Sequence, residues 1–267
     1  VDSSGMAQIL RGLGYKEVAS ASRARFIIVN TCGFIEAARQ ESYETLAELT
    51  ASRKKGQFII AAGCLAQRYG LEIAETVPGI DGIIGTRTWG DIGELIQQID
   101  AGNRPRPFCH LPDTGKITSR EDVRQIAVEG ASAWLKIADG CRHRCAFCAI
   151  PLIRGQHRSI PKEDLIYEAQ NLAEQGVKEL IVIAQDTTSY GIDLYGRREI
   201  ASLLKKLNCI DGIQWIRLLY TYPSQFPYDL IDAFHQCEKL CHYIDIPIQH
   251  ISDSVLRSMR RGISPRA

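Results

Sequence analysis

The apolar positions in the first hundred residues alternate between two periods. Short runs that are apolar on both faces predict buried strands, and the stretches between them carry the spacing of amphipathic helices. The strands are expected at 24–30, 57–63 and 80–85, and the helices at 3–14, 32–55, 65–77 and 91–100. Strands that alternate with helices predict a parallel sheet, so residues 1–100 form an α/β domain, of which the first strand is expected to be missing.

Residues 101–131 interrupt this rhythm. The stretch "AGNRPRPFCHLPDTGK" contains three prolines and two glycines, and no hydrophobic period runs through it. Such composition is typical of a connection between domains. The sequence therefore predicts a linker over 101–131.

The alternation returns after residue 131. Strands are predicted at 132–138, 178–185, 213–220 and 242–249, and helices at 161–175, 197–208, 227–236 and 252–260. Parallel units of this length are typical of a (β/α) barrel, whose chemistry lies at the carboxyl ends of the strands. Four strands cannot close a barrel, so residues 132–267 are expected to form part of one and the chain to be truncated at both ends.

Charge and cysteine content narrow the function classes. The 32 Lys and Arg nearly balance the 31 Asp and Glu, so no overall field attracts nucleic acid or membrane. The apolar runs are far shorter than the roughly 20 residues of a membrane span, and we expect a cytoplasmic protein without membrane partners. Nine cysteines, clustered in a chain of ordinary composition, favour metal or catalytic thiols over disulfides.

Three of these cysteines stand close together. Cys141, Cys145 and Cys148 follow the predicted strand 132–138 directly, in C-x3-C-x2-C spacing. Thiolates are the usual ligands of iron–sulfur clusters, and three of them leave one iron of a [4Fe-4S] cluster open. The alternatives are a zinc site completed by His143 or His157, and unligated structural cysteines. The position at a strand end favours the cluster.

Two further cysteines occupy equivalent places in the first domain. Cys32 and Cys64 each come directly after a predicted strand. In a parallel sheet both would emerge from the same edge and could converge on one metal site. Taken singly, each is more often a small buried residue.

The segments around these cysteines resemble a known family. "VNTCGF", "GCLAQRY" and "LKIADGCRHRCAFCAIPLIRG", with Phe147 just before the third cysteine, are similar to the methylthiotransferase family of radical S-adenosylmethionine enzymes. The resemblance implies a [4Fe-4S] cluster on Cys141, Cys145 and Cys148 whose open iron binds S-adenosylmethionine. It also implies an auxiliary [4Fe-4S] cluster on Cys32, Cys64 and a third cysteine that precedes this chain.

Other segments resemble one branch of that family. "AQDTTSYGID", "LLYTYP" and "YIDIPIQHISDSVLRSMRRG" look like the branch that modifies small-subunit ribosomal protein S-twelve. The implied fold is a flavodoxin-like domain, then a radical-SAM barrel, then a TRAM domain that is absent here. The implied reaction adds a methylthio group to the β-carbon of an aspartate of that protein, with electrons from a donor such as flavodoxin or ferredoxin.

Two alternatives to this function stay open. The first is a tRNA-adenosine 2-methylthiotransferase, which differs in its substrate. The second is a binding module that a zinc ion or a cluster stabilises, without catalysis. The substrate does not follow from the physical chemistry of the residues.

Polar residues on the third predicted barrel strand and at the ends of the second and fourth are candidates for binding S-adenosylmethionine or substrate. These are Gln185, Asp186, Arg217, Gln249 and His250, and Phe147 belongs to the same expectation through the cysteine motif. Polar strand ends also serve as helix caps and loop bonds. Each is therefore a hypothesis, and no residue is assigned a catalytic role.

Overall fold

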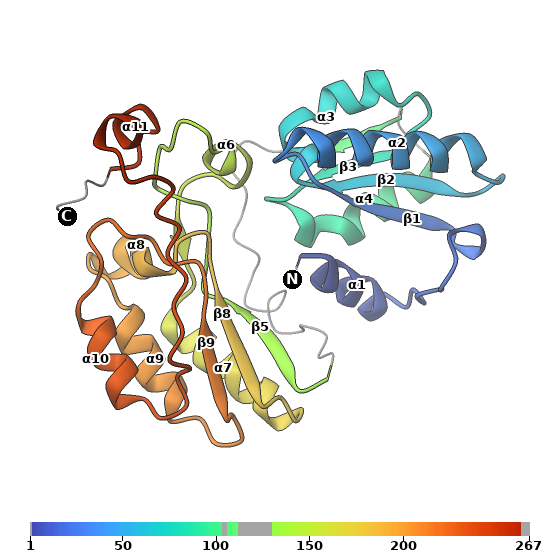
Figure 1. Cartoon of the computed structure of the whole chain (residues 1–267). Coiled ribbons are helices and arrows are strands. Elements are labelled where there is room, and N and C mark those ends of the chain that lie inside the picture. The colour runs from blue at the N-terminus through green and yellow to red at the C-terminus, as the bar shows by residue number, and fades with distance from the viewer. Residues whose placement is uncertain (1, 103–105, 112–129, 263–267) are drawn as a thin grey trace. The chain divides into compact units, whose positions relative to one another are not determined.

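The computed structural model describes residues 2–102, 106–111 and 130–262, and it divides into two compact units, Val1–Ala127 and Val128–Ala267 (Figure 1). Within the described ranges, no helix combines the length and the apolar composition that crossing a bilayer requires.

The first unit contains a parallel sheet of four strands. These are β1 (Phe26–Thr31), β2 (Phe58–Gly63), β3 (Gly82–Gly85) and β4 (Phe108–His110), in that spatial order. The helix α1 (Asp2–Gly12) precedes the first strand, and α2 (Glu36–Ser52), α3 (Cys64–Thr76) and α4 (Ile92–Ala101) lie between successive strands. The alternation predicted from the sequence is therefore confirmed for this unit.

Helices cover both faces of this sheet. In β2, Ile59 and Ala61 face a core that contains Leu46 of α2 and Ile73 of α3. The next residues along the strand, Ile60 and Ala62, face the opposite core with Met6, Trp89 and Ile96, to which α1 and α4 contribute. Because successive side chains of a strand point to opposite faces, a strand buried on both faces must be apolar throughout.

Strand β4 lies inside the range predicted as a linker. Phe108 N donates to the carbonyl oxygen of Asp81 at 3.0 Å, and Arg106 Nη1 donates to the buried Asp81 carboxylate at 2.6 Å. These bonds hold β4 beside β3. The strand has only three residues, which is too short for a hydrophobic period to be recognised in a proline-containing segment. The first sheet thus extends beyond residue 100, and residues 112–129 of the predicted linker lie outside the described residues.

The second unit is built on a parallel sheet of three strands. Its strands are β5 (Ser132–Lys136), β8 (Glu179–Ile183) and β9 (Trp215–Leu218), and its main helices are α7 (Lys162–Glu174), α9 (Ile200–Asn208) and α10 (Asp229–Gln236). Leu135, Val182 and Ile216 point into one core with the apolar faces of these helices. Trp134 and Trp215 point to the other face and are 43% and 56% exposed. Helices on only one face are typical of a barrel wall, so the partial barrel is confirmed.

Shorter elements complete this unit. Strands β6 (Ala138–Asp139) and β7 (Arg158–Ser159) pair in antiparallel fashion and enclose α6 (Ile150–Arg154). A 3-10 turn (Thr187–Ser189) and α8 (Ile192–Tyr195) follow β8, and α11 (Asp253–Ser258) lies near the end of the described chain.

The prediction of a fourth strand at 242–249 is wrong. Ile216 forms one bridge with Leu240, and Cys241 N donates to Ile216 O at 2.9 Å, but the ladder stops there. Beyond it, Tyr220 N donates to the side chain of Asp245 at 2.8 Å, so a carboxylate replaces the neighbouring backbone as acceptor. The residues Ile244, Ile246 and Ile248 are exposed and find no packing that would hold them as a strand.

Candidate metal centre

The loop that carries three cysteines begins at a glycine whose conformation only glycine readily adopts. Gly140 has φ +74°, and a Cβ atom there would collide with the carbonyl oxygen of Gln156. The next residue, Cys141, donates its N–H to Gly155 O at 3.1 Å. The two ends of the loop 140–156 are therefore held together next to the pair β6 and β7, beyond the carboxyl end of β5.

The thiols differ in burial. Cys141 is buried, whereas Cys145 and Cys148 are half-buried and are joined by a bond from Cys148 N to Cys145 O at 3.1 Å. Burial raises the pKa of the Cys141 thiol to about 11 and also raises the pKa of Cys148. Both thiols are protonated at neutral pH without a metal, so metal binding must displace their protons.

The donor set suits a cluster of soft metal ions. Among the described residues, no group of three or more His, Cys, Asp or Glu is arranged to hold one metal ion. A [4Fe-4S] cluster has a different requirement, because each thiolate binds a separate iron. Three thiols on one short loop, with no carboxylate among them, match the ligands of an iron–sulfur cluster.

A buried carboxylate holds the first part of this loop. Asp186, which follows β8 and is 1% exposed, accepts a hydrogen bond at 2.7 Å from His143 Nε2. It also accepts bonds from Thr188 Oγ1 and Ser189 Oγ, each at 2.5 Å. Burial opposes ionisation of Asp186, but the bonds from His143, Ser189 and Thr188 hold its pKa below the usual value. His143 is thereby fixed between Cys141 and Cys145.

Residues from two later segments, around 222 and 259–261, hold the second part of the loop. Tyr222 stacks on His143 with ring centroids 3.6 Å apart, and its hydroxyl lies 3.8 Å from Cys145 Sγ. Arg261 lies over the same ring, its Cζ 4.1 Å from the centroid, and its Nη1 donates to Cys145 Sγ at 3.6 Å. Ala146 N donates to Met259 O at 2.9 Å.

The predicted binding residues take different places. Gln185 has a buried Oε1 with no hydrogen-bond partner among the described residues, whereas neighbouring Asp186 is fully engaged by protein donors. Arg217 donates to Glu179 at 2.9 Å. The other three, Phe147, Gln249 and His250, are exposed, and His250 Nδ1 accepts a bond from Ser252 N at 2.9 Å. Of the five candidates that lie outside the cysteine loop, Asp186 alone forms a hydrogen bond to it among the described residues.

The two histidines considered as zinc ligands both have protein partners. His143 Nε2 bonds to Asp186, and His157 Nε2 lies 3.2 Å from Ser159 Oγ. Burial lowers the pKa of His157 and keeps its ring neutral. His157 Nδ1 is buried and has no partner among the described residues.

Sequence reasoning did not find Tyr222 and Arg261. Both lie in the segments "LLYTYP" and "SVLRSMRRG" that carry the family resemblance. They are 77 and 116 residues from Cys145, so no spacing in the sequence indicates that they touch it. Only the return of the chain to the cysteine loop brings them together.

In the first unit, Cys32 and Cys64 lie at one edge of the sheet. Thr31 pairs with Gly63 in the parallel register of β1 and β2, and each cysteine is the next residue along its chain. Gly63 has φ +103°, and a Cβ atom there would stand 2.6 Å from Asn30 Oδ1. Cys32 is exposed and Cys64 half-buried.

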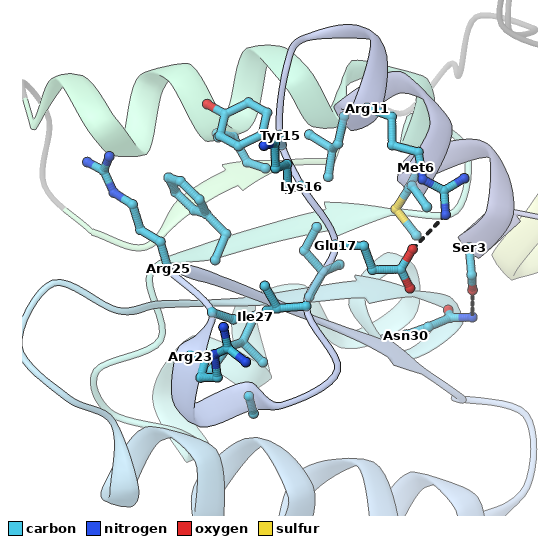
Figure 2. Close-up of a pocket in the computed structure, with 18 residues that line it drawn as sticks. Ser3, Met6, Arg11, Tyr15, Lys16, Glu17, Arg23, Arg25, Ile27 and Asn30 are labelled. Atoms are coloured by element: carbon cyan, nitrogen blue, oxygen red, sulfur yellow. Dashed lines mark hydrogen bonds and ion pairs between the residues drawn. The ribbon is translucent and has the colours of Figure 1, made fainter.

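A separate pocket lies beside β1 in this unit. Figure 2 shows its lining, to which α1, the following segment, β1 and Ile96 of α4 contribute, and its volume is about 590 Å³. An ion pair of 2.6 Å between Arg11 and Glu17 crosses it, and Asn30 Nδ2 donates to Ser3 Oγ at 2.7 Å. None of the predicted site residues lines it, so it contributes nothing to the metal centre.

Two protein families match this chain. Residues 1–85 match the family described as "Uncharacterized protein family UPF0004", and residues 135–267 match the radical SAM superfamily. The second match begins in β5 and includes the complete cysteine loop.

Curated relatives match nearly the whole chain. The ribosomal protein uS12 methylthiotransferase RimO of Symbiobacterium thermophilum is 44% identical over 263 residues, which cover 98% of this chain and 54% of the relative. The protein of the same name from Lachnoclostridium phytofermentans is also 44% identical and covers 98% of this chain and 59% of the relative. The chain thus spans little more than half the length of these relatives.

Solved structures share the fold at low identity. The radical S-adenosylmethionine methyltransferase TsrM from Kitasatospora setae aligns with a TM-score of 0.58 at 15% identity, over 90% of this chain and 51% of that structure. The cobalamin-dependent S-adenosylmethionine radical enzyme OxsB aligns with a TM-score of 0.60 at 12% identity, over 99% of this chain and 40% of that structure. These structures show the fold alone. The two sequence families and the RimO relatives show that the chain is similar in sequence to methylthiotransferases of the radical SAM superfamily over nearly its whole length.

Proposed function

We propose that the protein is a radical S-adenosylmethionine methylthiotransferase that modifies the β-carbon of an aspartate in ribosomal protein uS12. The observation that carries this proposal is the loop with Cys141, Cys145 and Cys148, which lies beyond the carboxyl end of β5 in a partial barrel. The names of relatives at 44% identity support uS12 as the substrate.

The three thiols of this loop would hold a [4Fe-4S] cluster. When bound and reduced, such a cluster supplies the electron for reductive cleavage of S-adenosylmethionine, which provides a radical able to attack an unactivated C–H bond. The chain contributes burial of Cys141, which excludes water from one side, and the contacts of His143 and Arg261 that fix the loop. Gln185 Oε1 is a buried acceptor suited to an ammonium or hydroxyl group of the cofactor.

Cys32 and Cys64 would hold the auxiliary cluster that serves sulfur insertion. Their equivalent places after Thr31 and Gly63 support this pairing. The hydrogen bond between Ser3 and Asn30 keeps the start of α1 at the same sheet edge, which suits the family position of the third cysteine just before this helix. We therefore propose two clusters, S-adenosylmethionine as cofactor, and flavodoxin or ferredoxin as electron donor.

Anaerobic reconstitution with iron and sulfide tests the cluster assignment. The reconstituted chain should be brown and absorb at about 400 nm, as thiolate-bound iron–sulfur clusters do. It should also cleave S-adenosylmethionine when reduced. Cys145→Ala should abolish cleavage, whereas Cys209→Ala, which removes an exposed cysteine elsewhere, should not. A colourless protein that retains only zinc would contradict the proposal and favour a zinc-stabilised binding module.

Mass spectrometry tests the substrate. In a strain that lacks the gene, the methylthio group should be missing from one aspartate-containing peptide of uS12, and tRNA nucleosides should be unchanged. Loss of the group from tRNA adenosine, with uS12 unaffected, would assign the protein to the tRNA-modifying branch instead.

A further inference from the structure

A buried guanidinium group lies against one of the three cysteine sulfurs. Arg261 is 5% exposed, and its Nη1 donates to Cys145 Sγ at 3.6 Å. A second nitrogen, Nη2, donates to the carbonyl oxygen of Pro247. The third, Nε, is buried and has no acceptor among the described residues. Arg261 therefore brings a positive charge and one unused N–H group to the cysteine loop.

No carboxylate neutralises this charge within the part of the chain that the structure describes. Arg261 takes part in none of the ion pairs found among the described residues of the second unit. The buried Asp186 nearby is already bonded to His143, Thr188 and Ser189. A buried cation without a counter-charge is costly, so this place in the fold favours an anion. The neighbouring thiols become anionic when they bind iron.

The position of Arg261 is fixed by a series of contacts from distant segments. Its guanidinium lies over the Tyr222 ring, and the Tyr222 hydroxyl donates to the backbone carbonyl of Arg261. Tyr222 stacks on His143, with an angle of 13° between the rings, and Asp186 holds His143. Planar groups stacked in this way restrict the guanidinium to one orientation.

We propose that Arg261 is the charge partner of the iron–sulfur cluster on Cys141, Cys145 and Cys148 and raises its reduction potential. Reduction adds a negative charge, so a nearby cation and N–H donors to sulfur stabilise the reduced form more than the oxidised form. Nη1 donates a hydrogen bond to Cys145 Sγ. The unused Nε–H would donate to a further sulfur or anionic ligand of the cluster. Asp186, His143 and Tyr222 act as positioning residues for Arg261. The inference rests on the proposed function, because it requires that cluster.

A redox titration of the reconstituted chain tests this role. Cys32→Ala and Cys64→Ala are introduced first, so that only the cluster of the loop forms, and the reduced cluster is followed by electron paramagnetic resonance. Arg261→Gln should shift the midpoint potential to a more negative value, and Arg261→Lys, which keeps the charge but loses the planar fork, should shift it less. The control Arg257→Gln removes an exposed positive charge from the same segment and should leave the potential unchanged.

The positioning series adds a second readout. Tyr222→Leu removes the stacking surface and should shift the potential in the same direction as Arg261→Gln. Tyr222→Phe keeps the ring and loses only the hydroxyl, so its shift should be smaller. A change in stability alone would not produce this order of potentials.

An unshifted potential in Arg261→Gln, with the iron and sulfide content of the unaltered chain, would overturn the inference. Where Arg261→Gln loses its cluster, an unshifted potential in Tyr222→Leu would overturn it in the same way. Failure of the proposed function looks different, because the unaltered chain itself would then take up no iron and sulfide. That result would overturn both proposals.

Discussion

The imidazole of His143 lies parallel to the phenol ring of Tyr222, with 3.6 Å between their centroids and 13° between their planes. His143 stands inside the cysteine loop, and Tyr222 follows β9. The stack therefore joins the loop to a distant strand end, and Asp186 completes it from β8 through its 2.7 Å bond to His143.

Replacing the anchor of His143 should loosen the cysteine loop. Asp186→Asn removes a buried charge-assisted acceptor and places an NH₂ group beside three donors, so we expect a loss of about 2 to 3 kcal/mol in the free energy of unfolding. Chemical denaturation followed by circular dichroism measures this loss. Asp211→Asn, in an exposed turn, is the matched control and should cost less than about 0.5 kcal/mol. Equal stability of both variants would show that Asp186 does not support the loop.

The first glycine of the loop should be irreplaceable. Gly140→Ala adds a Cβ atom that collides with the Gln156 carbonyl, at a backbone φ of +74°. The control Gly196→Ala adds a Cβ atom at a similar φ of +71°, where no other atom lies within 4 Å. The left-handed backbone costs each variant about 1 to 2 kcal/mol. Gly140→Ala should lose more than that and also take up iron and sulfide poorly. Similar denaturation midpoints and iron contents in the two variants would argue against this steric role.

Glu168 should make the stability of the chain depend on pH. This residue of α7 is 5% exposed, and neither carboxylate oxygen has a partner among the described residues. Burial, opposed in part by the charge of Lys136, raises its pKa from 4.5 to about 8. The folded chain therefore holds a proton that the unfolded chain releases, and stability from this group falls as the pH rises from about 4.5 to about 8.

Glu168→Gln removes this titration. The variant should be more stable than the unaltered chain above pH 8, by an amount on the order of 5 kcal/mol, and the difference should shrink toward pH 5. Thermal unfolding at several pH values measures it. A constant difference across this range would mean that Glu168 is ionised in the folded chain, contrary to the expectation.

The two cysteine sets should separate by iron content and activity. Cys64→Ala should lower the iron bound per chain and leave reductive cleavage of S-adenosylmethionine intact, because cleavage depends on Cys141, Cys145 and Cys148. In an assay of the complete reaction, the same variant should lose sulfur insertion. Normal methylthio transfer by Cys64→Ala would show that the assignment of Cys64 to an auxiliary cluster is wrong.

Much of the fold follows from local sequence pattern. The run 57–63 is apolar on both faces because β2 is buried between two helical layers. Nearly every position of the strand must therefore be apolar or small, and this can be recognised in the sequence. The position of Cys141 after a strand is equally local. Local pattern did not predict that β4 forms or that residues 242–249 do not form a strand. A three-residue strand is too short for a period, and an apolar run forms a strand only where a neighbouring strand accepts it.

The sequence by itself determined the parallel α/β architecture and the cysteine motif, because burial and ligand spacing act over a few neighbouring residues. Only the tertiary structure decided which groups surround the thiols. His143 meets Asp186 across 43 residues, and Cys145 meets Arg261 across 116. Such contacts depend on which segments meet at the strand ends in the folded chain. No hydrophobic period or residue spacing in the sequence indicates which segments these are.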